Sequence, residues 1–376
     1  MGNEHAPHVD WAALAAELGP VFAEREAVSD AEDRFAADNV ADLKARRAYA
    51  AAVPAELGGG DATMVELSTL LRGLARYAPA TALALSMHTH TVATIAWRWR
   101  HQDAPVDALL RRVATEQCVV ISTGGNDWLD SGGTAIAVEG GYRIDARKPF
   151  ASGLPSGDLI NTSAVLDDPA NGPTVLHFVV PCSAPGVRTV ETWRTLGMRS
   201  SGSNDVVLDG VFVPESAISG RRRKGVWHPL FHAVVPVASP LIYSVYVGVA
   251  EAARDLALRA VPGAARLDPS TQAAAGEMET NLATARMALA DMLAASGDAR
   301  GAETTSRVST GRQIAGTAAI RTVELALELA GGRGFFRSMG LEKLFRDIQA
   351  ARYHPVRSTD QRVLAGRLAL GVPIDG

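Results

Sequence analysis

The sequence predicts an α+β protein of three parts: an N-terminal helical domain (residues 1–117), a middle antiparallel β-domain (118–226) and a C-terminal four-helix bundle (227–376). Three observations predict it. Apolar residues first recur at the spacing of helices, then alternate at the spacing of strands, and then return to helical spacing. A chain of 376 residues is long enough to build two or three such units.

The first part has two helical patterns separated by a break. The patterns are carried by Trp11, Leu14, Leu18 and Phe22, and then by Leu67, Leu70, Leu71 and Leu74. Residues 53–60 (VPAELGGG) interrupt them, because proline and consecutive glycines do not continue a helix. We therefore expect helices on both sides of a turn.

The middle part alternates apolar and polar residues. Residues 134–139 and 142–146 flank Gly140-Gly141, which predicts a β-hairpin. Further strand-like runs follow at 159–165, 175–180 and 206–213. No helical segment of useful length separates these runs, which favours an antiparallel sheet.

The last part carries long helical runs at 240–260, 270–297 and 302–330, the last closed by Gly331-Gly332. Helices of this length need partners, and a four-helix bundle is the economical packing.

Composition excludes several classes of function. A net charge of -4 gives no reason to expect a nucleic-acid partner, although the basic run Arg221–Lys224 is expected in a solvated loop. The two cysteines, Cys118 and Cys182, have no metal-ligand spacing and predict neither a metal site nor a disulfide framework. No signal peptide and no uninterrupted apolar span of membrane length is evident, so we expect a soluble cytoplasmic protein.

Five segments, in this order along the chain, resemble motifs of the acyl-CoA dehydrogenase superfamily. They are residues 53–59 (VPAELGG), 141–153 (GYRIDARKPFASG), 193–206 (WRTLGMRSSGSNDV), 212–214 (FVP) and 329–347 (LAGGRG through LEK and RD). One such motif is weak evidence, but five in order are specific. The resemblance implies that family's fold, a flavin (FAD or FMN) between the β-domain and the bundle, and a homo-oligomer, either a tetramer or a dimer.

The resemblance also implies residues for the cofactor. Phe150 occupies the position of an aromatic ring that packs on the flavin, and Ser152 that of a hydroxyl near its reactive nitrogen. Strand alternation is expected to place both side chains on one face. Without the resemblance, Phe150 would be an inward core residue and Ser152 a strand-end cap.

Two further segments are implied to approach the flavin. Ser122 and Thr123 fall in the family's glycine-rich loop, whose backbone N–H groups can face a phosphate or a carbonyl. Gly331 and Gly332 match a turn that approaches the FAD of a neighbouring subunit, although two glycines also suit an ordinary helix C-cap. The family's Arg/Phe segment for that FAD is not reproduced at 259–267, which leaves FMN or loosely held reduced flavin open.

The family's catalytic base is missing. Its dehydrogenases need a carboxylate that removes a proton next to the thioester carbonyl. One expected position holds Pro355 and the other holds Ala238. The flavin monooxygenases of the same fold also lack this Glu, and some use histidines and a serine near the flavin.

The residues at comparable positions here are Ser152, His354 and one of His88 or His90. Histidine suits the task because its ordinary pKa lies near neutrality. On sequence alone, however, a lone histidine is more often structural.

The first hypothesis is therefore a two-component monooxygenase that receives reduced flavin from a reductase and forms a C4a-hydroperoxyflavin, acting on a small organic substrate. The second is an acyl-CoA or acyl-carrier dehydrogenase with a displaced base, for which Glu251, Asp360 and His354 are the candidates. The third is an inactive flavoprotein kept as a binding partner. The intact Phe150–Ser152 segment argues against the third.

Overall fold

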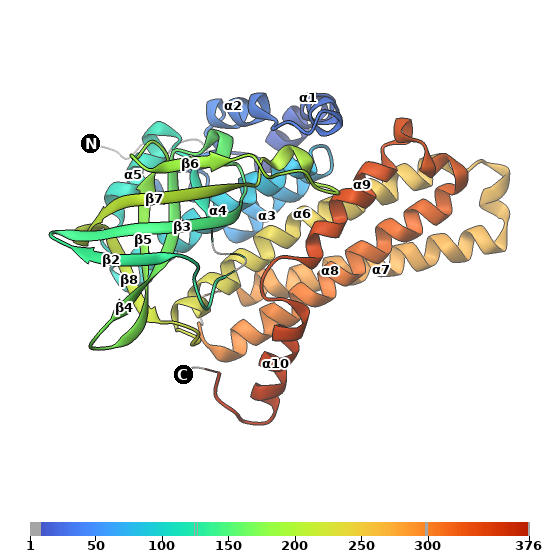
Figure 1. Cartoon of the computed structure of the whole chain (residues 1–376). Coiled ribbons are helices and arrows are strands. Elements are labelled where there is room, and N and C mark those ends of the chain that lie inside the picture. The colour runs from blue at the N-terminus through green and yellow to red at the C-terminus, as the bar shows by residue number, and fades with distance from the viewer. Residues whose placement is uncertain (1–8, 124, 126, 298–299, 375–376) are drawn as a thin grey trace, which may run out of the picture.

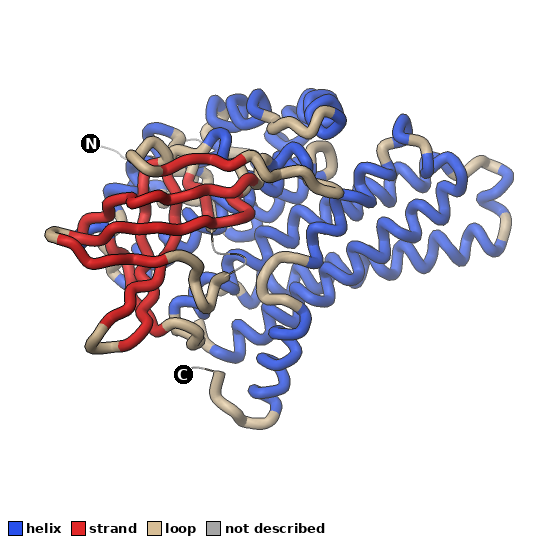
Figure 2. The backbone as a smooth tube through the Cα atoms, in the orientation of Figure 1, coloured by secondary structure: helices blue, strands red, loops and turns tan. Residues whose placement is uncertain are grey.

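The computed structural model describes residues 9–374 except 124, 126, 298 and 299. Figure 1 shows three parts in chain order: blue helices, a green sheet and a yellow-to-red group of long helices. The strands gather into one body beside the helices, as Figure 2 shows. The predicted order of helical, β and helical parts is confirmed within the described residues, while the domain boundaries stay a prediction.

The N-terminal helices pack around apolar faces set by the sequence pattern. They are α1 (Trp11–Ala31), α2 (Ala37–Ala45), α3 (Met64–Ala75), α4 (Pro79–Gln102) and α5 (Asp107–Glu116). α3 begins at a capping box, in which the Thr63 hydroxyl accepts from the Glu66 N–H and the Glu66 carboxylate accepts from the Thr63 N–H. α4 begins at Pro79, whose fixed φ suits the first helical position. Most of α4 is buried, so it is the central helix of this part.

The middle part is one sheet of β1 (Val120–Ser122), β2 (Thr134–Val138), β3 (Gly141–Ala151), β4 (Leu159–Asp168), β5 (Gly172–Pro181), β6 (Val187–Val190), β7 (Asn204–Pro214) and β8 (Ile218–Arg223). The order is β6-β7-β3-β2-β4-β5-β8, and β1 pairs with β4. The predicted hairpin is confirmed, with Val138 opposite Gly141. Antiparallel pairing dominates, but β4 pairs in parallel with both β1 and β2. The short strands β1, β6 and β8 were not predicted.

The expectation of a solvated loop at Arg221–Lys224 was wrong for most of that run. Residues 221–223 belong to β8, at the edge of the sheet, and Arg222 is buried. Its Nε donates to His177 Nε2 at 3.0 Å, and its guanidinium lies 5.0 Å from the ring centroid of Phe231. Strand alternation explains the error, because it turns the middle arginine inward while its neighbours stay exposed.

The C-terminal part is built on three long helices, α6 (Leu230–Ala260), α7 (Pro269–Ala295) and α8 (Ala302–Ala330). They pack on one another, α9 (Leu341–Ile348) packs against α6 and α8, and α10 (Ser358–Ala369) packs on α8. α6 is long and apolar enough to cross a membrane, but 89% of its most apolar window is buried inside the protein. That burial is typical of the core helix of a soluble enzyme fold.

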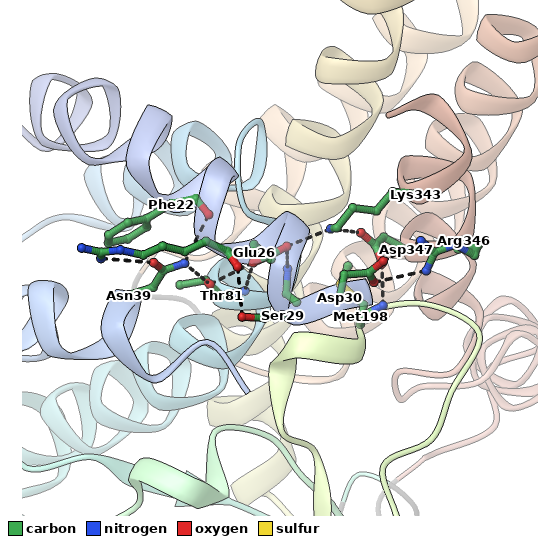
Figure 3. A network of polar contacts seen from close by, with 12 residues as sticks. Phe22, Glu26, Ser29, Asp30, Asn39, Thr81, Met198, Lys343, Arg346 and Asp347 are labelled. Atoms are coloured by element: carbon green, nitrogen blue, oxygen red, sulfur yellow. Dashed lines mark hydrogen bonds and ion pairs between the residues drawn. The ribbon is translucent and has the colours of Figure 1, made fainter. Parts of the chain in front are cut away.

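A buried network of charges joins the three parts (Figure 3). Lys343 of α9 lies between two carboxylates, with Nζ 2.9 Å from Glu26 Oε1 and 2.7 Å from Asp347 Oδ2. Burial alone would lower the pKa of Lys343, but Asp347 and Glu26 raise it above its ordinary value. Asp347 also accepts from the N–H of Met198, in the segment between β6 and β7. The N-terminal helices, the β-part and the bundle thus meet at one lysine.

Glu26 extends the network to α4. Its two carboxylate oxygens accept from the N–H groups of Ala80 and Thr81 at 3.1 and 2.9 Å. These are free N–H groups of the first turn, so a carboxylate of α1 caps α4 and complements its positive end. A second pair, Arg346 with Asp30 at 2.7 Å, repeats the link between α9 and α1.

We predict that Lys343→Met destabilises the protein by about 3–5 kcal/mol, because it leaves two buried carboxylates without their shared cation. The free energy of unfolding from urea titration measures the effect. As a control, Arg307→Gln breaks the exposed pair of Arg307 with Asp291 and should cost far less, because solvent screens that pair. Equal losses in the two variants would contradict a central role for this network.

Candidate functional site

The two histidines of α4 have different surroundings. Both ring nitrogens of His88 are occupied by main-chain groups: Nδ1 accepts from the Val120 N–H at 3.0 Å, and Nε2 lies 2.7 Å from the Tyr49 carbonyl oxygen. The ring is therefore the neutral tautomer with hydrogen on Nε2. His88 joins α4 to β1 and to the turn after α2, an arrangement typical of a structural histidine.

His90 is buried two residues further along and has free hydrogen-bonding capacity. Its Nδ1 is buried and has no partner among the described residues. Burial, reinforced by the neighbouring His88, lowers the pKa of His90 to about 4. Buried polar atoms normally have hydrogen-bond partners, so an unpartnered Nδ1 leaves His90 with the capacity for one hydrogen bond to a bound ligand.

His354 lies in the turn that follows the 3₁₀ segment Gln349–Arg352. Its Nε2 is 2.5 Å from the hydroxyl of Tyr246 on α6, and its main-chain carbonyl accepts from buried Arg312 on α8. Burial, then the charge of Arg312, then His90 lower the pKa of His354 to about 3. The ring is therefore neutral at ordinary pH.

The loop after β1 approaches the same turn. Thr123 Oγ1 donates to Thr162 Oγ1 at 2.7 Å, and Ser122 is half-buried at the end of β1. A Cβ built on Gly125 would lie 3.9 Å from Cδ of Pro355. β1 thus brings Ser122 and Thr123 toward the end of the chain that carries His354.

Phe150 and Ser152 do not share a face, contrary to the expectation from alternation. The pairing of β3 with β7 shifts register between Lys148 and Ala151, and Phe150 has a φ of 61°. This bulge turns Phe150 outward, so that its side chain is 53% exposed. Ser152 is buried, with Oγ 2.7 Å from Ser203 Oγ.

The exposed ring of Phe150 has one aromatic neighbour that sequence reasoning missed. Trp193, in the segment after β6, lies edge-on at 6.1 Å between ring centroids. Gly153 ties this region to α4, because a Cβ built there would lie 3.7 Å from Ala84 Cβ, one turn before His88. The Phe150 bulge therefore adjoins the helix that carries His88 and His90.

Gly331 and Gly332 lie elsewhere in the chain. They follow α8, and the 19 residues from Arg312 to Gly331 correspond to roughly 28 Å of helix. Both are exposed, and a Cβ on either would meet nothing within 4 Å. Within one chain they do not meet His354, so the predicted contact with a neighbouring subunit's cofactor stays a prediction.

The residues present fit a flavin. An exposed aromatic ring on a bulge offers a flat surface, and the buried Nδ1 of His90 is an unused polar atom. Ser122 and Thr123 carry hydroxyls at the end of β1, the strand whose Val120 N–H donates to His88. These are the groups a protein uses to orient a planar, polar-edged ring. Among the described residues, no group of three or more His, Cys, Asp or Glu could hold a metal ion.

The alternative bases are poorly placed for proton removal. Glu251 is buried among arginines, with Oε1 2.8 Å from Arg286 Nε and Oε2 3.5 Å from Arg76. Both oxygens of this carboxylate are thus engaged by arginine side chains. Asp360 pairs with Arg357 at 3.3 Å at the start of α10.

Tyr246 and Arg312 were also missed by sequence reasoning. Their signal was present, because a tyrosine within the apolar run of α6 and an arginine within α8 both need buried partners. The sequence pattern does not identify these partners.

Fold and site together define a flavin-dependent oxidoreductase. Family models named acyl-CoA dehydrogenase, N-terminal domain, and acyl-CoA dehydrogenase, C-terminal domain, match residues 12–103 and 240–354. The chain belongs to the acyl-CoA dehydrogenase family.

Individual relatives are similar over most of their length. The chain is 30% identical to the amino sugar nitrososynthase DnmZ of Streptomyces peucetius, covering 85% of this chain and 83% of that one. It is 28% identical to the amino sugar nitrososynthase RubN8 of Streptomyces rubradiris, covering 95% and 88%. The structure of KijD3 in complex with FMN and dTDP-3-amino-2,3,6-trideoxy-4-keto-3-methyl-D-glucose superposes with a TM-score of 0.87, at 27% identity, covering 99% and 97%.

We predict that His88→Ala destabilises the fold by about 2–4 kcal/mol, because two buried main-chain groups lose their partner. His90→Leu should cost less than about 1 kcal/mol, since its Nδ1 makes no bond in this structure. Urea titration of both variants gives the comparison. A loss at His90 as large as that at His88 would contradict this distinction.

Stability is also expected to fall in mild acid. The pKa of His88 and that of His90 are both lowered to about 4, mainly by burial, whereas unfolded histidine titrates near 6.5. The unfolded chain therefore binds more protons below pH 6.5, and each histidine lowers the free energy of unfolding by about 1.4 kcal/mol per pH unit toward pH 4. Urea titrations between pH 6.5 and 5.5, above the main carboxylate range, measure this slope. His90→Gln should reduce this slope by about half a proton at pH 6.5 and by nearly one proton at pH 5.5, and an unchanged slope in this variant would contradict the assignment.

Proposed function

We propose that this protein is a flavin-dependent monooxygenase and the oxygenase component of a two-component system. The observation that carries the proposal is the imidazole of His354, held by Tyr246 and directly before Pro355, which occupies one position where the resemblance expects the dehydrogenase carboxylate. The unpartnered Nδ1 of buried His90 supports it. A bound reduced flavin would give two electrons to dioxygen, one of whose oxygen atoms goes to the substrate and the other to water.

The chain's own residues would bind and orient the flavin and the substrate. Phe150, beside Trp193, would support the ring of FAD or FMN, while Ser122 and Thr123 would contact its polar edge. Buried Ser152 reaches the site only through a change of rotamer, because its hydroxyl bonds to Ser203. His354 and His90 would hold hydrogen bonds to the reacting oxygen or to the substrate without carrying charge.

The relatives guide the choice of substrate and cofactor. Two of them are named amino sugar nitrososynthases, and the KijD3 complex holds FMN with a nucleotide-linked amino sugar. We propose a small organic substrate that offers an amine nitrogen for oxidation, with FMN as the first cofactor to test and FAD as the second. A separate flavin reductase would supply the reduced flavin.

The acyl-CoA dehydrogenase reaction is the second candidate, favoured by the family models that match both helical regions. It needs a base that this site offers poorly, since Glu251 is held by arginines. We retain it as the alternative outcome of the experiment below.

A homo-oligomer, a tetramer or a dimer, and a cytoplasmic location are further parts of the proposal. Two large aromatic side chains beside Gly331 and Gly332 support association, because Phe335 is 89% exposed and Phe336 is 67% exposed. Light scattering of the purified protein measures the oligomeric state.

Rapid mixing tests the reaction type. The protein is loaded with reduced FMN or FAD without oxygen and mixed with oxygenated buffer. We expect a transient absorbance band that is distinct from both reduced and oxidised flavin and lasts for seconds. Immediate return of the oxidised spectrum, together with bleaching of oxidised flavin by an acyl-CoA panel, would instead establish a dehydrogenase.

In the same assay, His354→Ala should lower substrate turnover by roughly 10²-fold or more. The fold should survive, because Arg312 bonds to the main-chain carbonyl of residue 354, which the substitution keeps. A native circular dichroism spectrum is the control, because the melting temperature should fall somewhat when the Tyr246 hydroxyl loses its acceptor. Full turnover in this variant would remove His354 from the mechanism.

A further inference from the structure

Two tyrosines of α6 anchor the segment that carries His354. Tyr243 and Tyr246 are one turn apart on one face of the helix, and both are fully buried. The Tyr243 hydroxyl donates to the Ala351 carbonyl at 2.7 Å, whereas the Tyr246 hydroxyl lies 2.5 Å from His354 Nε2. One tyrosine thus holds the main chain of this segment and the other holds the imidazole.

The direction of the second bond follows from hydrogen-bond accounting. Burial raises the pKa of Tyr246 well above its ordinary value, so the phenol keeps its proton. That O–H has no other acceptor among the described residues, and leaving it unbonded would cost about 1–3 kcal/mol. The O–H therefore donates, and Nε2 of the neutral ring accepts.

The surroundings keep the ring in this state. Three charged or titratable groups from other helices act on this pair: Arg312 of α8 and His90 of α4 lower the pKa of His354, and Asp347 of α9 raises that of Tyr246. The Arg312 charge opposes a second proton on His354, and the bond from Arg312 to the carbonyl of residue 354 fixes the turn. A neutral ring that accepts at Nε2 must carry its hydrogen on Nδ1.

Nδ1 is the nitrogen left for a ligand. Within the described part of the chain it has no hydrogen-bond partner, and His354 is only partly buried. We propose that Tyr246 is a positioning residue that fixes His354 in the Nδ1–H tautomer, so that His354 presents a hydrogen-bond donor, and not a base, to the reaction site. The role of this donor in oxygen transfer rests on the proposed function, but the tautomer itself does not.

Nitrogen NMR of the full-length protein tests the tautomer without any turnover. Histidine labelled with ¹⁵N in both ring positions is incorporated, and His354→Gln identifies the signals of residue 354 by their loss. We expect a protonated, pyrrole-type Nδ1 and an unprotonated, pyridine-type Nε2, with and without FMN. A wild-type spectrum with the hydrogen on Nε2 overturns the proposal, even if no variant can be purified.

Tyr246→Phe and Tyr243→Phe form a matched pair, because each removes one buried hydroxyl from the same face of α6. Tyr246→Phe should convert residue 354 to a mixture of tautomers or to Nε2–H, whereas Tyr243→Phe should leave the wild-type pattern. An unchanged pattern in Tyr246→Phe, with a wild-type melting temperature, also overturns the proposal.

Kinetics separate this inference from the function on which it rests. In the monooxygenase assay, Tyr246→Phe should lower kcat by roughly 10²-fold with little change in KM, and Tyr243→Phe should lower it far less. If the NMR pattern holds but no oxygen transfer occurs with any substrate, the tautomer stands and the proposed function fails. If oxygen transfer occurs and Tyr246→Phe keeps full kcat, the positioning role fails alone.

Discussion

The rest of the structure depends on the ammonium of Lys343, which lies between two buried carboxylates. Its positive charge compensates the negative charges of Glu26 and Asp347. Each carboxylate also accepts hydrogen bonds from main-chain N–H groups in another part of the chain: Glu26 from the start of α4, and Asp347 from Met198. Glu26 sets the start of α4, which carries His88 and His90. Asp347 sets the end of α9, from which the chain continues to His354. Lys343 thus links the helix that carries His88 and His90 to the helix that leads to His354, through the network drawn in Figure 3.

This arrangement leaves the candidate site with uncharged imidazoles. The permanent charges are gathered in the network and in paired arginines such as Arg346 with Asp30, while His90 and His354 lie in surroundings that disfavour a proton. Burial and the nearby Arg312 act in the same direction on His354. A site of this kind offers directional hydrogen bonds in place of a proton-abstracting group, which agrees with the missing carboxylate noted in the sequence.

The sequence was sufficient for the order of helical and β parts, for the hairpin around Gly140 and for the family, because periodicity and ordered motifs carry that information. It was insufficient where a single side chain points in a direction that the local pattern does not predict. Strand alternation predicts that Phe150 and Ser152 share one face of β3. The register shift before Ala151 instead turns the Phe150 ring outward, while Ser152 stays buried. Alternation also turns Arg222 inward on an edge strand too short to be recognised. The partners of His88 and His354 come from residues 39 and 108 positions away, Tyr49 and Tyr246, and no local pattern encodes such contacts.

The left-handed backbone conformation of Phe150 costs conformational free energy. Selection for stability alone would favour another residue at this position. A bulky residue at a φ of 61° is disfavoured by about 1 kcal/mol or more relative to glycine, which adopts this conformation freely. Its ring recovers little of this energy by burial, since half of it faces solvent in the isolated chain. Screens that reward only expression or heat resistance should therefore drift toward glycine or asparagine at this position.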